Sequence, residues 1–352
     1  MMVYMTLKET PQITVVIPTY NRAKLLKRAI NSVLNQTYPN FQICVYDNHS
    51  KDQTESTVKK LAKKDSRVRY HKHKKNLGGI ANWIYGMKHV NTPYFTVLCD
   101  DDIYLPNFFE TVIKGFKKHP DAMMSIGLNI IMNENGVISR VSLPSWEKEG
   151  YYTTPEGFFQ SIKDCPAWIP IIFKKTVIKK IGTMDLNLFE IDLDYIWRIT
   201  SKFPFVISKK ECSISTIHSN SSCEKMNSKL IYPDYFKICD KIYKDKKIHE
   251  DIKKKAKILF NDQFKKMALS KWLRDIKRKD FKDAHKIQEI LYKKYKTNLK
   301  LIIMRSILKT VEYSPIAWSL FTNIIIKLRN SIFNTNKLQK EYGKYSKYLK
   351  YN

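Results

Sequence analysis

Three consecutive aspartates, Asp100, Asp101 and Asp102, stand just after the apolar run Tyr94–Leu98. Carboxylates at the end of a buried strand repel one another unless a cation or hydrogen-bond donors compensate their charge. Their oxygens are hard ligands that suit Mg²⁺ or Mn²⁺, and proteins commonly share these ions with the phosphates of a substrate. A solvated turn before a helix opened by Pro106 is the alternative. The triplet alone does not distinguish the two, so the segments around it matter.

Short apolar runs alternate along the first 120 residues with segments whose apolar residues recur at helical spacing. The first run is β-branched and ends at Pro18, which is typical of a buried strand. The expected strands are Ile13–Ile17, Phe41–Tyr46, Val68–His71 and Tyr94–Leu98, and the expected helices are Leu25–Leu34, Glu55–Leu61, Ile80–Val90 and Asn107–Phe116. This alternation predicts an α/β fold with a mainly parallel sheet and flanking helices.

Polar segments follow three of the expected strands: Thr19–Arg22, Asp47–Ser50 and Asp100–Asp102. Ligands of parallel sheets collect at the carboxyl ends of the strands, so these segments should line one rim. A fourth polar segment, Asn76–Gly79 with Asn82 after it, precedes a helix, where glycines allow close backbone approach and free N–H groups can meet an anion. A plain turn is the alternative for the fourth segment.

These four segments, in this order, resemble the motifs of glycosyltransferase family 2, whose members have the GT-A fold. The resemblance is carried by Val15–Arg22, Val45–Asp52, Asn76–Asn82 and Leu98–Asp102, and it covers residues 10–220. It implies a Rossmann-like fold and a metal-dependent, inverting transfer of a sugar from a nucleoside diphosphate sugar to a hydroxyl. The acceptor would be a glycan or a lipid-linked glycan, as in bacterial capsule, O-antigen and other polysaccharide synthesis.

The resemblance also implies roles for single residues. The donor sugar nucleotide would be bound by Thr19, Tyr20, Asn21, Arg22, Asp47, Asn48, Asn76, Gly78, Gly79, Asn82 and Asp100. Asp101, with Asp102, would hold Mn²⁺ or Mg²⁺ against the diphosphate, where a cation neutralises charge on the departing group. His218 matches a histidine that some members use as a further metal ligand, although a lone histidine is more often structural. Asn48 stands where many members have a second aspartate, which leaves the nucleotide base open.

Downstream, Phe189–Arg198 resembles the segment that supplies the family's catalytic base. Asp192 holds that position, where it would take the proton from the acceptor hydroxyl as this oxygen attacks the sugar, giving inversion. Glu190 and Asp194 are rivals, because Ile191 occupies a position at which many members have glutamate. A helix start that carries acids for its dipole is the alternative.

The chain has 352 residues and a formal net charge of +30. Residues 241–352 contain 30 basic and 10 acidic residues and so carry +20 of this charge. We expect a GT-A domain over residues 1–225, with a nucleotide-sugar half at 10–120 and an acceptor half at 121–225. A basic helical region would follow at 226–352.

Two other functions are compatible with parts of the sequence. The basic charge would suit a nucleic-acid-binding protein. We expect no nucleic-acid partner, because no recognised nucleic-acid module is present and the basic residues lie away from the acidic motifs. A sugar nucleotidyltransferase would share the architecture, but it should show a glycine-rich phosphate loop near its N-terminus, and Pro18–Arg22 is not one.

No segment reaches the ~18 uninterrupted apolar residues of a membrane span, and Met1–Lys8 lacks the pattern of a signal peptide. These features predict a cytoplasmic protein. Lysine-rich helical segments and the run Tyr313–Ile326, with its aromatic and basic flanks, could lie on an anionic membrane surface at the inner face of the cytoplasmic membrane. Packing on the catalytic domain is the alternative. The six cysteines form no C-x-x-C pair and are expected to be reduced.

Overall fold

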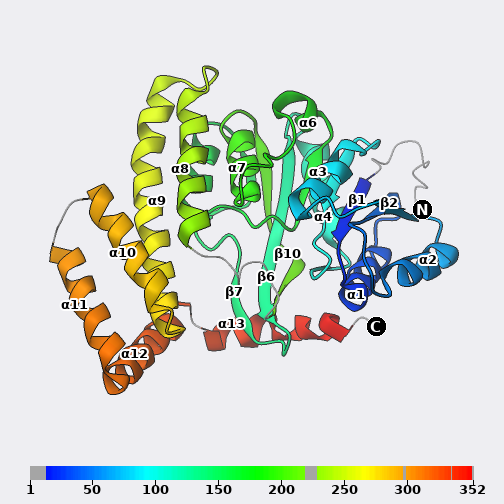
Figure 1. Cartoon of the computed structure of the whole chain (residues 1–352). Coiled ribbons are helices and arrows are strands. Elements are labelled where there is room, and N and C mark those ends of the chain that lie inside the picture. The colour runs from blue at the N-terminus through cyan, green and yellow to red at the C-terminus, as the bar shows by residue number, and fades with distance from the viewer. Residues whose placement is uncertain (1–12, 219–227, 296–298, 334, 351–352) are drawn as a thin grey trace. The chain divides into compact units, whose positions relative to one another are not determined.

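The computed structural model describes residues 13–218, 228–295, 299–333 and 335–350. It divides into two compact units (Figure 1). The first unit comprises residues 1–218 together with 342–352, and the second comprises residues 219–341. The domain boundary that we expect between residues 225 and 226 lies outside the described residues.

The first unit contains ten described strands and seven α-helices before residue 219. The strands are β1 (Ile13–Thr19), β2 (Phe41–Asp47), β3 (Val68–Lys72), β4 (Tyr94–Val97), β5 (Ile103–Tyr104), β6 (Met124–Asn133), β7 (Ile138–Val141), β8 (Gly150–Tyr152), β9 (Ile171–Lys174) and β10 (Phe205–Ile217). The helices are α1 (Ala23–Leu34), α2 (Thr54–Lys64), α3 (Gly79–Lys88), α4 (Phe108–Lys118), α5 (Glu156–Lys163), α6 (Thr176–Ile181) and α7 (Ile191–Thr200). All eight elements expected in the first 120 residues are present.

The strands form one sheet in the order β3-β2-β1-β4-β9-β6-β10-β5, with β7 beside β6 and β8 beside β10. The first four strands are parallel, as the alternating pattern predicts. Beyond β4 the sheet is mixed, because β9 is antiparallel to both β4 and β6 while β10 runs parallel to β6. Thr19 pairs with Asp47 across β1 and β2, so the polar segments after these strands begin side by side.

Apolar residues at helical spacing fix the helices against this sheet. In α1, Leu26, Ala29, Ile30 and Val33 are fully buried. Helix α3 approaches β1 closely at Gly86, where a Cβ atom would come within 2.3 Å of a Val16 methyl carbon. These contacts hold the N-terminal ends of the helices near the carboxyl ends of the strands, where the polar segments lie.

The second unit is helical. Its helices are α8 (Ser228–Lys244), α9 (Glu250–Lys277), α10 (Phe281–Tyr295), α11 (Leu299–Tyr313) and α12 (Pro315–Phe333), and α13 (Thr335–Tyr342) ends at the border of the first unit. Its core contains a buried ion network in which Lys271 Nζ lies 2.6 Å from Asp275 and 2.7 Å from Asp283.

Among the described helices, none is long and apolar enough to cross a membrane. The five described cysteines carry free thiols, and Cys223 lies outside the described residues.

Candidate active site

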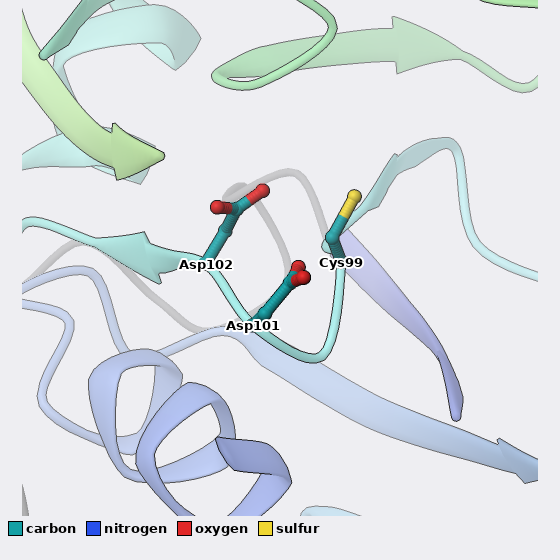
Figure 2. Close-up of side chains that lie close together, drawn as sticks. All are labelled: Cys99, Asp101 and Asp102. Carbon is teal, nitrogen blue, oxygen red and sulfur yellow. The ribbon is translucent and has the colours of Figure 1, made fainter. Parts of the chain in front are cut away.

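The aspartate triplet occupies a tight turn between β4 and β5. The turn is closed by a hydrogen bond from the backbone N–H of Asp102 to the carbonyl of Cys99, at 3.1 Å. Figure 2 shows the side chains of Cys99, Asp101 and Asp102 gathered on this turn, and one ligand atom from each lies within 4.8 Å of the others. Asp100 and Asp102 are buried. The turn therefore concentrates three carboxylates, which we call the carboxylate cluster, at the end of the central strand β4.

The segment after β1 contacts this cluster directly. Thr19 Oγ1 donates a hydrogen bond to Asp100 Oδ2 at 2.8 Å. Arg22 Nη1 lies 2.9 Å from Asp100 Oδ1 and 2.9 Å from Asp101 Oδ2, so one guanidinium group bridges both carboxylates. The predicted meeting of the first and third polar segments at one rim is thus present in the structure.

The end of β10 supplies the other side of the cluster. The backbone N–H of Thr216 donates to Asp102 Oδ1 at 2.9 Å, and His218 Nε2 lies 2.9 Å from Asp101 Oδ2. This approach depends on β5, which follows the cluster and pairs antiparallel with β10 at Ile214. His218 therefore stands beside Asp101, and its predicted role as a metal ligand stays a prediction.

Arg28 is a residue of this site that the sequence analysis does not identify. Its Nη2 donates to the carbonyl of Asp101 at 2.6 Å and to Thr216 Oγ1 at 3.1 Å. The side chain is buried, and burial lowers the pKa of its guanidinium group against the pull of Asp102 and Asp101. The available signal is an arginine on the buried face of the amphipathic helix α1. Arg28 ties the cluster's backbone to the end of β10.

Burial and mutual repulsion dominate the electrostatics of the cluster. Burial, followed by the charge of Asp101, raises the pKa of Asp100 to about 6, although Arg22 and Thr19 oppose the shift. The same two causes raise the pKa of Asp102 well above its usual value. Burial raises the pKa of the Cys99 thiol, and the neighbouring carboxylates add to that increase. A cation bound here would favour the ionised carboxylates.

The segment after β2 is held to the segment after β1 by a series of hydrogen bonds. Asp47 is fully buried, and it accepts hydrogen bonds from Ser50 N at 2.8 Å and from the Tyr70 hydroxyl at 2.5 Å. Ser50 Oγ in turn accepts from the backbone N–H of Asn21 at 2.8 Å. Asn21 has a φ of 52°, a left-handed conformation that asparagine tolerates better than most residues. In this structure the hydrogen bonds of Asp47 with Ser50 and Tyr70 therefore stabilise the segment after β2.

The segment before α3 joins the same rim. Asn48 Nδ2 donates to Asn76 Oδ1 at 2.8 Å, and Asn48 Oδ1 accepts from Leu77 N at 2.7 Å. Asn82 is buried and bonded at both ends of its amide, to the Tyr46 carbonyl and to His73 Nε2, each at 2.8 Å. The predicted donor-binding residues Asn48, Asn76 and Asn82 are therefore engaged with protein groups here.

Other predicted donor-binding residues face open space. Tyr20 is exposed, and a Cβ atom added at Gly78 or Gly79 would meet nothing within 4 Å. Gly78 also has a φ of 87°, which a glycine adopts without strain. These positions, with Arg22, border the solvent-facing side of the rim.

Asp192 lies in the first turn of α7. It accepts a hydrogen bond from Leu193 N at 2.9 Å, and it forms no ion pair with any described residue. Burial raises the pKa of Asp192, opposed by its backbone hydrogen bonds. A carboxylate whose pKa is raised in this way is a better proton acceptor at neutral pH.

The rival Asp194 is committed to an ion pair within the helix. It is fully buried, and its Oδ2 lies 2.8 Å from Arg198 Nη2. Arg198 also donates to the carbonyls of Ile181 and Thr183, at 2.6 and 2.9 Å. These contacts anchor α7 to the loop before it. Glu190, the other rival, immediately precedes α7 as its N-cap residue.

A short chain of contacts connects α7 to the carboxylate cluster. Tyr195, three residues after Asp192, packs on the indole of Trp168 with ring centroids 6.2 Å apart. The Trp168 Nε1–H group donates to the carbonyl of Val97 at 3.1 Å, three residues before Asp100. The start of α7 is thereby fixed relative to the end of β4.

Comparison with known proteins identifies the first half of the chain. Residues 14–182 match the family model "Glycosyl transferase family 2". The match covers the segments after β1, β2 and β4 and the segment before α3, but it ends before Asp192 and His218.

Curated relatives agree with this match. An uncharacterized glycosyltransferase of Rickettsia typhi is 32% identical over 183 residues, which is 51% of this chain and 55% of the relative. The GalNAc(5)-diNAcBac-PP-undecaprenol beta-1,3-glucosyltransferase of Campylobacter jejuni is 31% identical over 133 residues, or 37% of this chain and 41% of the relative. The chain thus spans about half the length, or less, of these relatives.

Solved structures share the fold. S. aureus TarS 1-349 in complex with UDP-GlcNAc superposes with a TM-score of 0.62 at 15% identity, covering 90% of this chain and 92% of that one. The mannosyltransferase PcManGT of Pyrobaculum calidifontis, in complex with GDP-Man and Mn²⁺, gives a TM-score of 0.55 at 13% identity and covers 94% of this chain and 87% of that one. The family match identifies residues 14–182 as a glycosyltransferase family 2 segment, and the sheet topology and the solved structures give the fold as GT-A.

Proposed function

We propose that this protein is an inverting glycosyltransferase that moves a sugar from a nucleoside diphosphate sugar to a hydroxyl of a glycan or lipid-linked acceptor. The observation that carries the proposal is the carboxylate cluster at the end of β4, which is held by Arg22 from one side and His218 from the other. Carboxylates and cationic groups at the carboxyl ends of parallel strands are suited to a phosphorylated ligand and its metal ion.

The donor would occupy the rim between the segments after β1 and β2 and the start of α3. Asp100, oriented by Thr19 and Arg22, would accept a hydrogen bond from a ribose hydroxyl. The exposed Tyr20 and the open space over Gly78 and Gly79 leave room for the nucleoside and diphosphate. Buried Asp47, Asn48 and Asn82 would support these contacts by fixing the loops.

The donor atoms of the site fit a divalent cation such as Mn²⁺ or Mg²⁺. Asp101 and Asp102 offer hard carboxylate oxygens, and the His218 imidazole stands 2.9 Å from Asp101. These three residues would hold the ion. When bound, the ion would supply charge stabilisation to the departing nucleoside diphosphate. The Mn²⁺ complex of the mannosyltransferase PcManGT supports the choice of ion.

Asp192 would act as the general base. Its carboxylate lies at the start of α7 and has no ion-pair partner among the described residues, whereas Asp194 is bound to Arg198. Asp192 would accept the proton of the acceptor hydroxyl while that oxygen attacks the anomeric carbon from the side opposite the leaving diphosphate. Attack from that side inverts the anomeric configuration.

The nature of the substrates is suggested by the relatives. The C. jejuni relative and a 29% identical E. coli relative, WfgD, are named as glucosyltransferases that act on undecaprenol-diphosphate-linked acceptors. The TarS complex contains UDP-GlcNAc. A UDP-sugar donor and a lipid-linked glycan acceptor are therefore the first candidates, and polysaccharide synthesis is the process they suggest.

The test measures donor binding by calorimetry with UDP-, dTDP-, GDP- and CMP-sugars, with and without Mn²⁺. Wild type should bind one nucleotide class in a metal-dependent manner. Asp101→Asn should abolish the metal dependence and lower kcat/KM about 10²-fold or more, because several kcal/mol of charge stabilisation are lost. Asp65→Asn is the matched control, since Asp65 pairs with Arg67 before β3, at the opposite end of the parallel strands. Wild type that binds none of the four classes would refute the proposal.

A further inference from the structure

Helix α12 of the second unit presents an apolar stripe to solvent. Its members Ile316, Leu320 and Ile324 are exposed to 75%, 61% and 55%. They are spaced four residues apart and therefore share one face of the helix. Tyr313, just before the helix, is 83% exposed. We call Ile316, Leu320 and Ile324 the apolar stripe.

The opposite face of α12 is firmly packed within the unit. Trp318 Nε1 donates to the carbonyl of Ile276 in α9 at 2.8 Å, and Phe321 contacts the ring of Trp272 with centroids 6.4 Å apart. Thr322 is buried. The helix is thus anchored through one face while a second apolar face stays in water, which costs free energy unless something covers it.

The charged residues of α11 and of α12 up to Lys327 are almost all basic. From residue 299 to 327 the sequence contains Lys300, Arg305, Lys309 and Lys327 but a single acid, Glu312. Glu312 is bonded to His285, 2.8 Å away. Lys327 lies eleven residues after Ile316, on the same helical face as the stripe, and it is exposed. A long lysine side chain at that place can extend its ammonium group toward lipid phosphates.

We propose that the apolar stripe of α12 docks into the surface of an anionic phospholipid bilayer. Helix α12 would lie in the interface, since no described helix can span a membrane. Apolar insertion and attraction of the lysines to acidic headgroups would act together. A second copy of this chain is a poorer occupant, because pairing two such faces would bring lysines against lysines with no acid on α12 to compensate them. This inference does not depend on the proposed catalytic activity.

The experiment measures how much of the full chain cosediments with sucrose-loaded vesicles. Neutral vesicles of phosphatidylcholine are compared with anionic vesicles that contain about 30% phosphatidylglycerol in phosphatidylcholine. Wild type should bind the anionic vesicles, and 0.5 M NaCl, whose Debye length is about 4 Å, should weaken binding. The triple variant Ile316→Asn, Leu320→Asn, Ile324→Asn should bind about tenfold or more weakly, because three side chains lose their insertion. Ile258→Asn is the matched control, since Ile258 is a 63% exposed apolar residue on α9.

A second variant tests the electrostatic part without touching the stripe. Lys309→Gln with Lys327→Gln should lower binding to anionic vesicles severalfold and leave the circular dichroism spectrum unchanged. The proposal is overturned if wild type ignores anionic vesicles or if the triple variant binds them as well as wild type. It is equally overturned if light scattering shows a wild-type oligomer that the triple variant dissolves, because a second copy would then cover the stripe.

Discussion

His218 Nε2 lies 2.9 Å from Asp101 Oδ2, although the two residues are 117 positions apart in the chain. The approach requires that β10 ends beside the turn after β4, and the short β5–β10 pairing provides this. The same Asp101 oxygen is 2.9 Å from Arg22 Nη1. Two cationic or hydrogen-bonding groups, one from the segment after β1 and one from the residue after β10, therefore converge on one carboxylate oxygen.

If His218 helps hold the metal ion, removing its imidazole should weaken the ion's binding. We expect His218→Ala to lower the apparent Mn²⁺ affinity by at least about 10–100-fold, because losing even an outer-shell partner of a metal ligand has an effect of that size. The measurement is a Mn²⁺ titration of transferase activity at saturating donor. His285→Ala, a histidine variant in the second unit, serves as control and should keep the wild-type affinity. A loss of thermal stability in His218→Ala with an unchanged Mn²⁺ titration would indicate a purely structural histidine.

Arg28 is expected to position the carboxylate cluster. Its Nη2 donates to both the Asp101 carbonyl and Thr216 Oγ1, and a lysine side chain is one bond too short to bring its nitrogen to the same point. Arg28→Lys keeps the charge but should cost about 1.5–3 kcal/mol of hydrogen bonding to a charged group, equivalent to roughly tenfold or more in Mn²⁺ affinity. Arg67→Lys, at a surface pair before β3, should leave the titration unchanged. A lower melting temperature without any change in Mn²⁺ affinity would contradict the positioning role.

Much of the donor half of the site can be predicted from sequence because its information is local. The runs that become β1, β2 and β4 each end in a polar segment, and parallel neighbours place such ends at one rim. Thr19, Arg22 and Asp100 meet for this reason. The strand pairing in the mixed half of the sheet is harder to predict. Its strands pair with segments far apart in the chain, and the local periodicity of apolar residues does not show which strands pair.

Two features show the limit in physical terms. Strand β5 has two residues, too few for any alternation to be visible, yet it brings β10 to the cluster. Arg28 interrupts the buried face of α1, where a sequence pattern favours an apolar residue, and only its contacts with Asp101 and Thr216 explain its place. The sequence resemblance favours Asp192 as the base but leaves Asp194 as a rival. In the structure Asp194 is ion-paired with Arg198, whereas Asp192 forms no ion pair with a described residue.

The assignment of the base can be tested by comparing these acids. Asp192→Asn should lower kcat by about 10²–10⁴-fold while donor binding stays unchanged, because an amide cannot accept the proton. Asp194→Asn should instead destabilise the fold by about 3–5 kcal/mol, the usual cost of breaking a buried ion pair, because Arg198 is left uncompensated. Kinetics and thermal unfolding of both variants, with Glu190→Gln beside them, make the comparison. If Glu190→Gln loses turnover and Asp192→Asn keeps it, Glu190 is the base.

The pH dependence of turnover and of stability tests the role and the raised pKa of Asp192 independently. Burial raises its pKa, and the base works only when ionised, so the acid limb of kcat should lie above the ordinary aspartate value of about 3.9. The same shift affects stability. Because the folded protein holds this proton to higher pH than the unfolded chain, the contribution of Asp192 to stability is full below the unfolded pKa and is lost as pH rises through the folded pKa. Asp192→Asn removes this loss, so the variant should gain stability over wild type on going from acid to neutral pH. Urea unfolding of both proteins across that range measures the difference, and a difference that stays constant with pH would mean that the pKa of Asp192 is not raised.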